Sequence, residues 1–449
     1  MKWNKYLNPE RIRVTTRDKT LDPRNEFESD FGRVIFSPAT RRMHDKTQVF
    51  PLTLDDNIHS RLTHSMEVMA IGHSLGLRVC EQEEFLNKTR LDKEEIHRTI
   101  PVILKNACLV HDIGNPPFGH FGETVIANYF EDLFKNENGN FTLSKEERED
   151  YEFFDGNAQG LRVLTKLQLL HKEEAGLNLT YATLGAFLKY PNSGKIDKSI
   201  ISTSKRGVFQ SEIKYLKLVG ENCGMVNGNS FIRHPLSYLM EAADSICYLV
   251  MDIEDGFNKG WYNFDFIKSK FGHIDLVKKK LEDLSKIESD AKGLSRMVKL
   301  RIFLISELVK LAVKNYVENL EEICDGSYNK ELIKDDESGL TDALSSFTVK
   351  HIFKKREIQQ LELTGHSVLT GLLDYYIDCL FKKSKDYKRR ALGMISGSII
   401  QAALFENNTD EFDNLSDYAK LRIIVDFISG MTDQFALIHF QKLSGQKIS

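Results

Sequence analysis

The chain has few of the residues that mark several large protein classes. Its 449 residues include only 9 prolines and 6 cysteines, and the cysteines are scattered without a Cys-x-x-Cys pair. This pattern argues against a disulfide scaffold and predicts reduced thiols. No run of eighteen apolar residues occurs, and the first residues contain no apolar leader. We therefore expect neither a membrane span nor export, and a cytoplasmic location.

A large excess of charge is also missing. The formal net charge is -4, which argues against strong non-specific binding to nucleic acid, although it leaves room for a local basic patch. The sequence contains no G-x-x-x-x-G-K-[ST] loop, no G-x-G-x-x-G after a strand and no G-x-S-x-G motif. Kinase, ATPase, Rossmann and serine-hydrolase functions are therefore not supported.

What the chain does contain is helical periodicity. Apolar residues make up 41% of it, enough for a large core. They recur at helical spacing over 61–80, 94–113, 121–135, 155–171 and 236–254, and again beyond 261. Residues 190–229 are rich in Gly, Ser, Lys and Asn and predict a short irregular or partly β insertion, while the charged stretches 136–152 and 325–341 predict exposed loops. We therefore expect a mainly helical, all-α fold.

Composition also predicts the organisation of the chain. Residues 1–32 are polar without clear periodicity and predict an N-terminal arm. Residues 33–260 contain the chemically distinctive motifs and predict the catalytic core. Residues 261–449 predict a C-terminal helical region packed on that core, because no Pro/Ser/Gly-rich linker separates the two.

Four residues have the chemistry of metal ligands: His64, the adjacent pair His111 and Asp112, and Asp244. Two imidazoles and two carboxylates suit a borderline divalent cation. His111 and Asp112 end a strongly apolar helix, where a carboxylate is costly to bury unless a cation compensates it. A salt bridge to Arg or Lys is the alternative for Asp112, and an ordinary buried histidine is the alternative for His64.

A candidate acid/base pair follows nine residues later. His120 and Glu123 come directly after Pro116 and Pro117 and are three residues apart, so they share one helix face. A carboxylate beside an imidazole raises the pKa of the imidazole, which suits a general acid at neutral pH. The alternative is that Glu123 only interacts with the positive end of its helix.

A polar stripe continues from the last candidate ligand. Asp244, Tyr248 and Asp252 recur every four residues and therefore lie on one side of a helix, among apolar neighbours. Two carboxylates and a phenol are costly on an inner face without ligands. For Asp252 the alternative is the start of a solvated acidic helix end.

Three cations are candidates for contact with an anionic ligand, and Arg41 and Arg42 are two further candidates. Arg61 precedes His64 by about one helical turn, so both side chains can point the same way. Lys205 and Arg206 lie in a predicted loop that can approach a phosphate. Each of the three is also compatible with an ordinary surface charge.

Taken together, RLTHS (61–65), HDIGNPPFGHFGE (111–123) and MEAADSICY (240–248) resemble the HD-domain deoxynucleoside triphosphate triphosphohydrolases, in particular the bacterial deoxyguanosine triphosphate triphosphohydrolases. Similar stretches at 33–52, 155–164, 362–376 and 426–437 extend the resemblance over nearly the whole chain. It implies an HD-domain fold with added C-terminal helices. It also implies hydrolysis of dGTP or other dNTPs to a deoxynucleoside and inorganic triphosphate.

The resemblance assigns roles to individual residues. It implies one divalent metal, with Mn or Mg expected first and Ni, Co, Fe or Zn also compatible. The implied roles are metal binding for His64, His111, Asp112 and Asp244, acid/base catalysis for His120 and Glu123, phosphate contact for Arg61 and for Lys205 or Arg206, and sugar contact for Gln48, Tyr248 and Asp252. Asn115 stands where some relatives carry a second histidine, so no such role is implied there.

Partners and alternatives complete the expectations. The resemblance implies a dNTP substrate and a homo-oligomer, commonly a hexamer, and some relatives bind single-stranded DNA; no membrane is implied. Three other functions stay open: an HD-type phosphodiesterase or 5′-nucleotidase, a single-stranded nucleic-acid-binding protein or nuclease, and an inactive regulatory or scaffold protein. The reaction products and the salt dependence of DNA binding would distinguish them.

Overall fold

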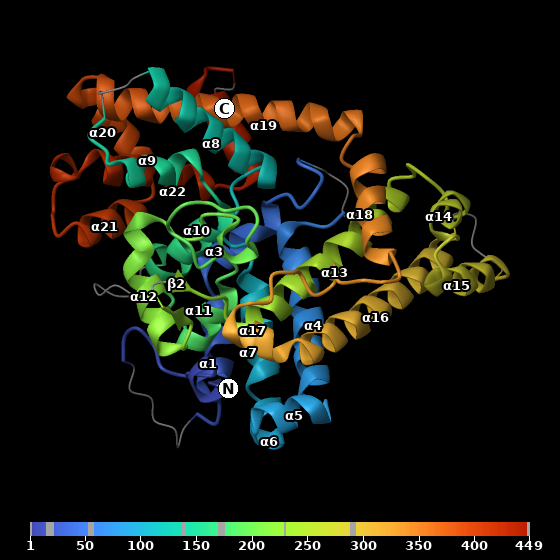
Figure 1. The fold of residues 1–449 in the computed structure, drawn as a ribbon. Helices are drawn as coiled ribbons and strands as arrows, with labels where there is room; N and C mark the ends of the chain where they lie inside the picture. The colour runs from blue at the N-terminus through green and yellow to red at the C-terminus, as the bar shows by residue number, and fades with distance from the viewer. Residues whose placement is uncertain are drawn as a thin grey trace.

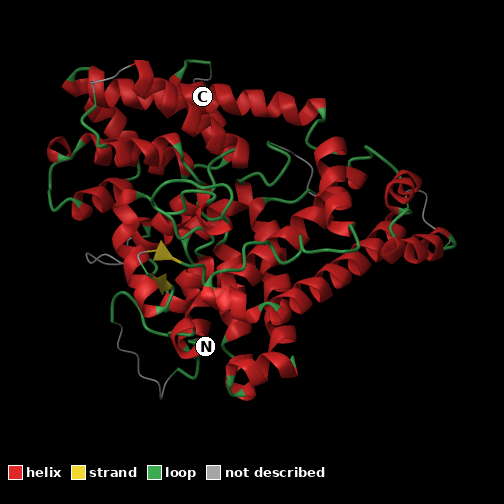
Figure 2. Cartoon of the chain, viewed as in Figure 1, coloured by secondary structure: helices red, strands yellow, loops and turns green. Residues whose placement is uncertain are grey.

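The structure is a computed structural model that describes residues 2–14, 22–52, 58–136, 141–168, 176–228, 230–287 and 293–446. The all-α expectation is confirmed, because helices supply almost all of the regular structure (Figure 2). Within the described ranges the only strands are β1 (Val226–Asn227) and β2 (Ser230–Phe231). They pair antiparallel, with Val226 opposite Phe231 and Asn227 opposite Ser230.

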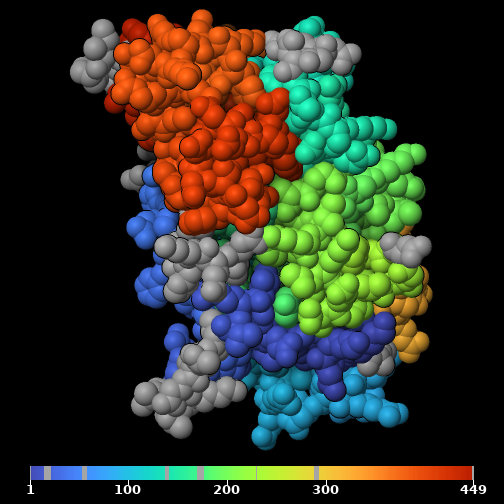
Figure 3. All heavy atoms as spheres, turned by 90° about the vertical axis from the view of Figure 1, so that its left-hand side faces the viewer, coloured from blue at the N-terminus to red at the C-terminus, as the bar shows by residue number. Residues whose placement is uncertain are grey.

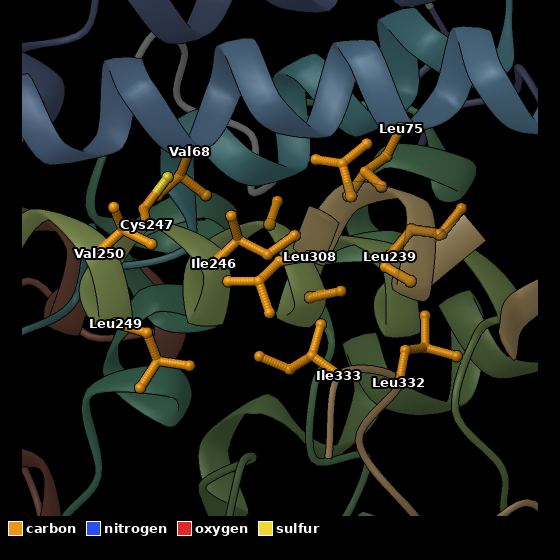
Figure 4. Packing of buried hydrophobic residues seen from close by; sticks show 14 of the residues in the cluster. Val68, Leu75, Leu239, Ile246, Cys247, Leu249, Val250, Leu308, Leu332 and Ile333 are labelled. Carbon is orange, nitrogen blue, oxygen red and sulfur yellow. The ribbon is translucent and has the colours of Figure 1, made fainter. Parts of the chain in front are cut away.

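Three long helices form the centre of the molecule: α4 (Arg61–Cys80), α7 (Ile100–Val110) and α13 (Pro235–Asn258). Figure 4 shows apolar side chains of α13 lying between α4 on one side and α16 (Leu294–Glu318) with the segment at Leu332 and Ile333 on the other. Helices α4 and α7 lie very close together, because a methyl group added to Gly72 would come within 2.3 Å of Cys108 Sγ. This close packing brings the start of α4 beside the end of α7.

A second apolar cluster lies under the C-terminal helices. It joins α8 (Gly119–Asn136) to α19 (Arg356–Ile377) and α22 (Asp417–Ser429), with Phe130, Leu369, Leu372 and Ile424 fully buried. In Figure 1, α19 runs across the top of the molecule with α8 and α22 beneath it. The helix that carries His120 and Glu123 is therefore packed against the C-terminal region.

The remaining helices surround these two clusters. They are α1 (Trp3–Tyr6), α2 (Glu26–Ile35), α3 (Pro38–Arg42), α5 (Glu83–Thr89), α6 (Lys93–His97), α9 (Lys145–Glu152), α10 (Gly156–Arg162), α11 (Tyr181–Phe187), α12 (Ile213–Asn222), α14 (Phe264–Phe271), α15 (Asp275–Ser285), α17 (Leu320–Asp325), α18 (Leu340–His351), α20 (Lys385–Met394), α21 (Gly397–Glu406) and α23 (Asp433–Leu443).

Several predicted elements differ in detail. The helix expected at 94–113 is two helices, α6 and α7, and Pro101 lies in the first turn of α7, where a missing N–H group is tolerated. The helix expected at 155–171 is α10 followed by a π-helical turn over Val163–Leu167, and residues 169–171 lie outside the described part. The loop expected at 136–152 is wrong over 145–152, which form α9.

Helix α9 forms despite its high charge because of its first turn. Ser144 and Glu147 make a capping box, in which each side chain accepts a hydrogen bond from the other residue's backbone N–H. In the predicted insertion, residues 189–200 are irregular and the two short strands are present, but 213–222 form helix α12. In α9 and α12, local capping and amphipathic packing thus outweigh the composition that predicted a loop or an irregular segment.

The segment predicted as an arm is anchored to the core. Trp3 and Tyr6 are 1% exposed and join the central cluster, and the Tyr6 hydroxyl donates a hydrogen bond to the Cys324 carbonyl (2.9 Å). Helix α2 follows at residues 26–35. In Figure 3 this N-terminal segment, in dark blue, lies between the green middle of the chain above it and a lighter-blue segment at the base. The division at residue 260 stays a prediction.

No single helix of the described residues is long and apolar enough to cross a membrane. One pair, α22 with α23, passes the length and composition test together, but the two helices meet at a bend of 115°. Helix α22 is mostly buried in the protein, as expected for a core helix.

Candidate functional site: a His/Asp cluster beside an acid/base pair

Three helix ends build the site. Ser60 begins α4 through a capping box with Thr63, which places Arg61 and His64 in the first turns of the helix. Helix α7 ends at Val110, so His111 and Asp112 follow its last turn. Asp244 comes from the middle of α13, which packs against both helices. His64 and Asp244, which are 180 positions apart in the sequence, therefore face one another.

The structure brings three of the four predicted metal ligands into one cluster. His64 Nε2 lies 3.2 Å from Asp244 Oδ1, and His111 Nε2 lies 3.4 Å from the same oxygen. One ligand atom from each residue lies within 4.8 Å of the other two. The two imidazole rings are 5.4 Å apart between centroids. Both histidines are buried, whereas the Asp244 side chain is 22% exposed.

Asp112 lies at the edge of this cluster and also forms the salt bridge considered as its alternative. Its Oδ2 is 3.3 Å from His111 Nε2 and contacts the buried guanidinium of Arg61. Asn115 Nδ2 donates a hydrogen bond to Asp112 Oδ1 (3.1 Å), so both carboxylate oxygens are held. Asn115 thus has a positioning contact beside the His/Asp cluster.

The donor set fits a divalent cation. His111 Nδ1 donates to the Cys108 carbonyl (2.7 Å), which leaves Nε2 directed at the carboxylates as a buried atom without a hydrogen-bond partner. A metal-binding histidine has this arrangement. Burial opposes a charged imidazole, yet Asp112 and Asp244 raise the pKa of His111 to about 10. The Asp112 and Asp244 carboxylates therefore provide negative charge that a bound cation would neutralise.

His120 and Glu123 form the expected pair on the first turn of α8. His120 Nδ1 lies 3.0 Å from Glu123 Oε2, while Glu123 Oε1 accepts a hydrogen bond from the Gly156 N–H (3.0 Å). Glu123 is buried, whereas the His120 side chain is 75% exposed and accessible to a ligand. The charge of Glu123 raises the pKa of His120 above its ordinary value.

Arg61 connects the pair with the His/Asp cluster. Its Nε donates to the Thr47 carbonyl (3.1 Å), and its Nη1 contacts Asp112. A methyl group added to Gly119 would come within 2.9 Å of Arg61 Nη2, so the guanidinium reaches the residue next to His120. The Arg61 guanidinium is thus held between the His120–Glu123 pair and the His/Asp cluster.

The two adjacent loop cations have different environments. Lys205 Nζ lies 2.7 Å from Asp155 Oδ2 and lines the same surface groove as Glu123. Arg206 is fully buried and forms ion pairs with Glu149 (2.7 Å) and Asp150 (2.8 Å). The geometry therefore favours Lys205, and Arg206 has a structural role against α9.

The stripe on α13 faces inward as expected. Asp252 is 4% exposed, and burial, with Asp255 and Asp244 nearby, raises the pKa of its carboxyl well above the ordinary range. Tyr248 is half-buried on the same side of the helix. Gln48 has a buried side-chain oxygen without a hydrogen-bond partner. The Asp252 carboxyl and the Gln48 side-chain oxygen therefore remain available to a ligand in a largely apolar setting.

Two supporting residues had no signal in the local sequence pattern. Asp433, at the start of α23, accepts hydrogen bonds from the backbone N–H groups of Thr47 (3.1 Å) and Phe118 (3.0 Å). Lys46 donates to the carbonyls of Asn115 (2.6 Å) and Ser429 (2.7 Å). These contacts fasten the loop after Asp112 to the C-terminal helices across more than 300 residues of sequence.

Comparison with known proteins agrees with this architecture. Residues 61–176 match the HD domain, and residues 335–442 match the phosphohydrolase-associated domain. HD domains are metal-dependent hydrolases, and the His/Asp cluster described above fits that class.

Full-length relatives define the family. A deoxyguanosinetriphosphate triphosphohydrolase-like protein of Listeria monocytogenes is 36% identical over 99% of this chain and 100% of its own length. A protein with the same description from Synechocystis is 33% identical over 99% of both chains. The deoxyguanosinetriphosphate triphosphohydrolase of Yersinia enterocolitica is 32% identical over 93% of both. The chain therefore belongs to the deoxyguanosinetriphosphate triphosphohydrolase-like family of HD-domain proteins.

Proposed function

We propose that the protein hydrolyses dGTP, and other deoxynucleoside triphosphates to an extent still to be measured, to a deoxynucleoside and inorganic triphosphate. The observation that carries the proposal is the His120–Glu123 pair beside the His64, His111 and Asp244 cluster. Membership of a family whose relatives are named for this reaction supports it. In this reaction water attacks the α-phosphorus and the bond to the sugar 5′ oxygen breaks.

The ligand set of the proposed metal is His64, His111, Asp112 and Asp244. Two nitrogen and two oxygen donors leave room for water and substrate around Mn²⁺ or Mg²⁺, and Ni, Co, Fe or Zn are also compatible. When bound, the ion would polarise an α-phosphate oxygen and help to activate the attacking water. Asn115 and Arg61 hold the Asp112 carboxylate in place for this role.

The residues of the chain supply the remaining chemistry. His120, kept protonated by Glu123, would give a proton to the leaving 5′ oxygen. Arg61 and Lys205 would share the negative charge that develops on the phosphates. Glu123 is held by the Gly156 N–H, so the imidazole stays oriented during the transfer.

Selection of deoxyribose is proposed to depend on the α13 stripe. Tyr248 would pack against the sugar and leave no space for a 2′ hydroxyl, while Asp252 and Gln48 would bind the 3′ hydroxyl. A site that binds one hydroxyl and excludes another discriminates well, because the wrong sugar leaves a buried group unpaired.

Product analysis tests the proposal. The protein is incubated with each of the four deoxynucleoside triphosphates and with GTP, in the presence of Mn²⁺ or Mg²⁺, and the products are separated by ion exchange. We expect equal amounts of deoxynucleoside and inorganic triphosphate, and no product from the Asp112→Ala protein prepared in the same way. Nucleoside monophosphate with pyrophosphate, or release of phosphate from monophosphates, would instead indicate the phosphodiesterase or nucleotidase alternative.

Three other expectations remain predictions. They are the hexameric assembly, the binding of single-stranded DNA and the cytoplasmic location. Light scattering at micromolar protein concentration tests the first, because a mass near that of the 51.6 kDa chain would contradict it.

A further inference from the structure

A cavity of about 690 Å³ lies behind the His111–Asp112 pair. Its walls come from α3 and the segment before it, from Ile113 and Gly114 in the loop after the pair, from α10 and the turn that follows, and from the C-terminal helices α21, α22 and α23. None of the residues proposed to bind the metal, the phosphates or the sugar lines it. The cavity is therefore separate from the reaction site, although the two share one loop as a wall.

The charges that line the cavity are mainly positive. Arg33 and Arg42 contribute two guanidinium cations, Lys46 contributes an amine whose pKa burial lowers to about 7, and Asp426 contributes the one carboxylate. Asp426 is already balanced, since both of its oxygens lie 2.9 Å from Arg162 Nε. The two guanidinium groups thus face the cavity without a compensating charge from its own lining.

The contacts of these cations leave hydrogen-bonding capacity free. Lys46 is buried, and within the described part of the chain its hydrogen bonds go to the neutral carbonyls of Asn115 and Ser429. Arg33 donates through Nη1 to the Leu177 carbonyl (3.2 Å), and its Nε is a buried donor with no partner. Arg42 makes no hydrogen bond or ion pair within the described ranges of the chain. A guanidinium in this state suits a phosphate or a carboxylate, which it can bind in a bidentate manner.

The rest of the lining is apolar and partly aromatic. Leu167, Phe427 and Met431 form the interior, and Phe36 and Phe435 lie exposed at 81% and 50%. The volume lies within the range of small-molecule sites, which combine an apolar wall with a few polar groups that fix orientation. A ligand with a flat apolar ring would cover this wall while its anionic group contacts the cations.

We propose that this cavity binds a small organic anion, with a phosphate or carboxylate group on Arg33 and Arg42 and an apolar ring against the C-terminal helices. The site is additional to the proposed reaction site and does not require the dGTP assignment. It also adjoins the Asn115 loop: Lys46 lines the cavity and holds the Asn115 carbonyl, while the Asn115 side chain holds Asp112. An anion in the cavity would therefore attract Lys46, which fixes this loop.

The probe is 8-anilinonaphthalene-1-sulfonate, a ring system with one anionic group whose fluorescence rises in apolar surroundings. The full-length protein is titrated with the probe, and Arg42→Glu is compared with Arg41→Glu. Arg41 and Arg42 are exposed neighbours on α3, but only Arg42 lines the cavity, and both changes alter the net charge equally. We expect one saturable site whose Kd rises at least tenfold in Arg42→Glu and less than about twofold in Arg41→Glu, because salt screens the remote charge.

Competition identifies the anionic group. Phenyl phosphate and benzoate present the same ring with different anions, and inorganic phosphate presents the anion alone. Displacement of the probe by either organic anion, at lower concentration than by inorganic phosphate, supports the proposal and shows which group is preferred. Displacement by neither, or by inorganic phosphate equally well, overturns it.

Folding is controlled independently. Circular dichroism and the thermal midpoint are compared for the two charge-reversal proteins, and Arg42→Gln, which keeps size without charge, replaces Arg42→Glu if the latter unfolds. An unchanged Kd in a folded Arg42 variant, or an equal loss in Arg41→Glu, places the probe elsewhere and contradicts the proposal.

Discussion

At the scale of single residues, the site depends on how each imidazole is held. His111 is fixed by a bond from Nδ1 to a backbone carbonyl, so that its other nitrogen faces the carboxylates. His120 is fixed by a carboxylate and points into solvent. The first arrangement suits a ligand and the second suits a proton donor, because a ligand must be unprotonated and a donor protonated.

The first prediction concerns His120. His120→Ala should lower kcat by about 10²–10⁴ if the imidazole acts as the general acid, while metal content is retained. Since Glu123 raises the pKa of His120, kcat should stay high up to a pH above the ordinary histidine value and fall as pH rises through the raised pKa. Glu123→Gln should move this fall to lower pH. If the pH–rate profiles of the wild-type and Glu123→Gln proteins had the same midpoint, the role of Glu123 would be contradicted.

A second prediction distinguishes two roles of Asp112, that of a metal ligand and that of the salt-bridge partner of Arg61. Asp112→Ala should abolish both the bound metal and activity, because it removes a ligand and leaves Arg61 unpaired beside the cluster. Elemental analysis of the purified protein measures the metal directly. If the variant keeps full metal occupancy, Asp112 serves only as the salt-bridge partner of Arg61.

Asp252 provides a third prediction. Asp252→Ala should lower kcat/KM for deoxynucleotides several-fold, because a net hydrogen bond to a sugar hydroxyl contributes about 0.5–1.5 kcal/mol. The wild-type protein should also prefer dGTP to GTP, as steady-state kinetics with the two substrates will measure. Equal hydrolysis of both would rule out the proposed sugar contacts on α13.

At the scale of elements, the connection between α7 and α8 determines the site. It begins with His111 and Asp112, contains two prolines, and leads directly to His120 in the first turn of α8. Gly114 permits this connection to touch α10, since an added methyl group would lie 2.0 Å from the Gly160 nitrogen and 2.2 Å from the Gly156 oxygen. The approach of two backbones at this point leaves no space for a side chain.

Gly114→Ala is therefore the fourth prediction. The loop must shift to admit the methyl group, so we expect lower thermal stability together with weaker metal binding and activity. Gly393→Ala in α20 is the matched control, because open space surrounds that position and alanine favours the helix. Differential scanning fluorimetry should show a lower midpoint for the first protein and an equal or higher one for the second.

At the scale of the whole molecule, buried charges join the core to the C-terminal helices. Arg162 at the end of α10 pairs with Glu212 (2.9 Å), Glu406 of α21 (3.2 Å) and Asp426 of α22 (2.8 Å). Together these groups leave Arg162 with a pKa raised well above its ordinary value, since the three carboxylates outweigh the effect of burial. The two regions are therefore fixed to each other by ion pairs as well as by apolar contact.

The fifth prediction tests that connection. Arg162→Ala should lower the free energy of unfolding by about 3–5 kcal/mol, because it removes the ion-pair partner of the buried Asp426, although Lys166 still pairs with Glu212 and Glu406. Arg389→Ala breaks an exposed pair with Asp386 and should change it by no more than about 1 kcal/mol. Equilibrium urea denaturation followed by circular dichroism measures both. Similar losses in the two proteins would contradict the importance of the buried network.

The sequence by itself determined the features that depend on short spacing. Helical periodicity predicted α4, α8 and α13 to within a few residues, because one amphipathic helix carries its own signal. The His120–Glu123 pair and the Asp244 stripe are local for the same reason: residues three or four apart on a helix share a face.

Only the tertiary structure decided which distant groups meet. The contact of Asp433 with Thr47 and Phe118, and that of Lys46 with Ser429, join residues more than 300 positions apart, and no spacing rule relates such residues. Lys205 and Arg206 are neighbours in sequence, yet the Lys205 side chain is partly exposed beside Asp155, whereas Arg206 is buried against α9. Their difference depends on the carboxylates that surround each side chain, which packing alone brings together.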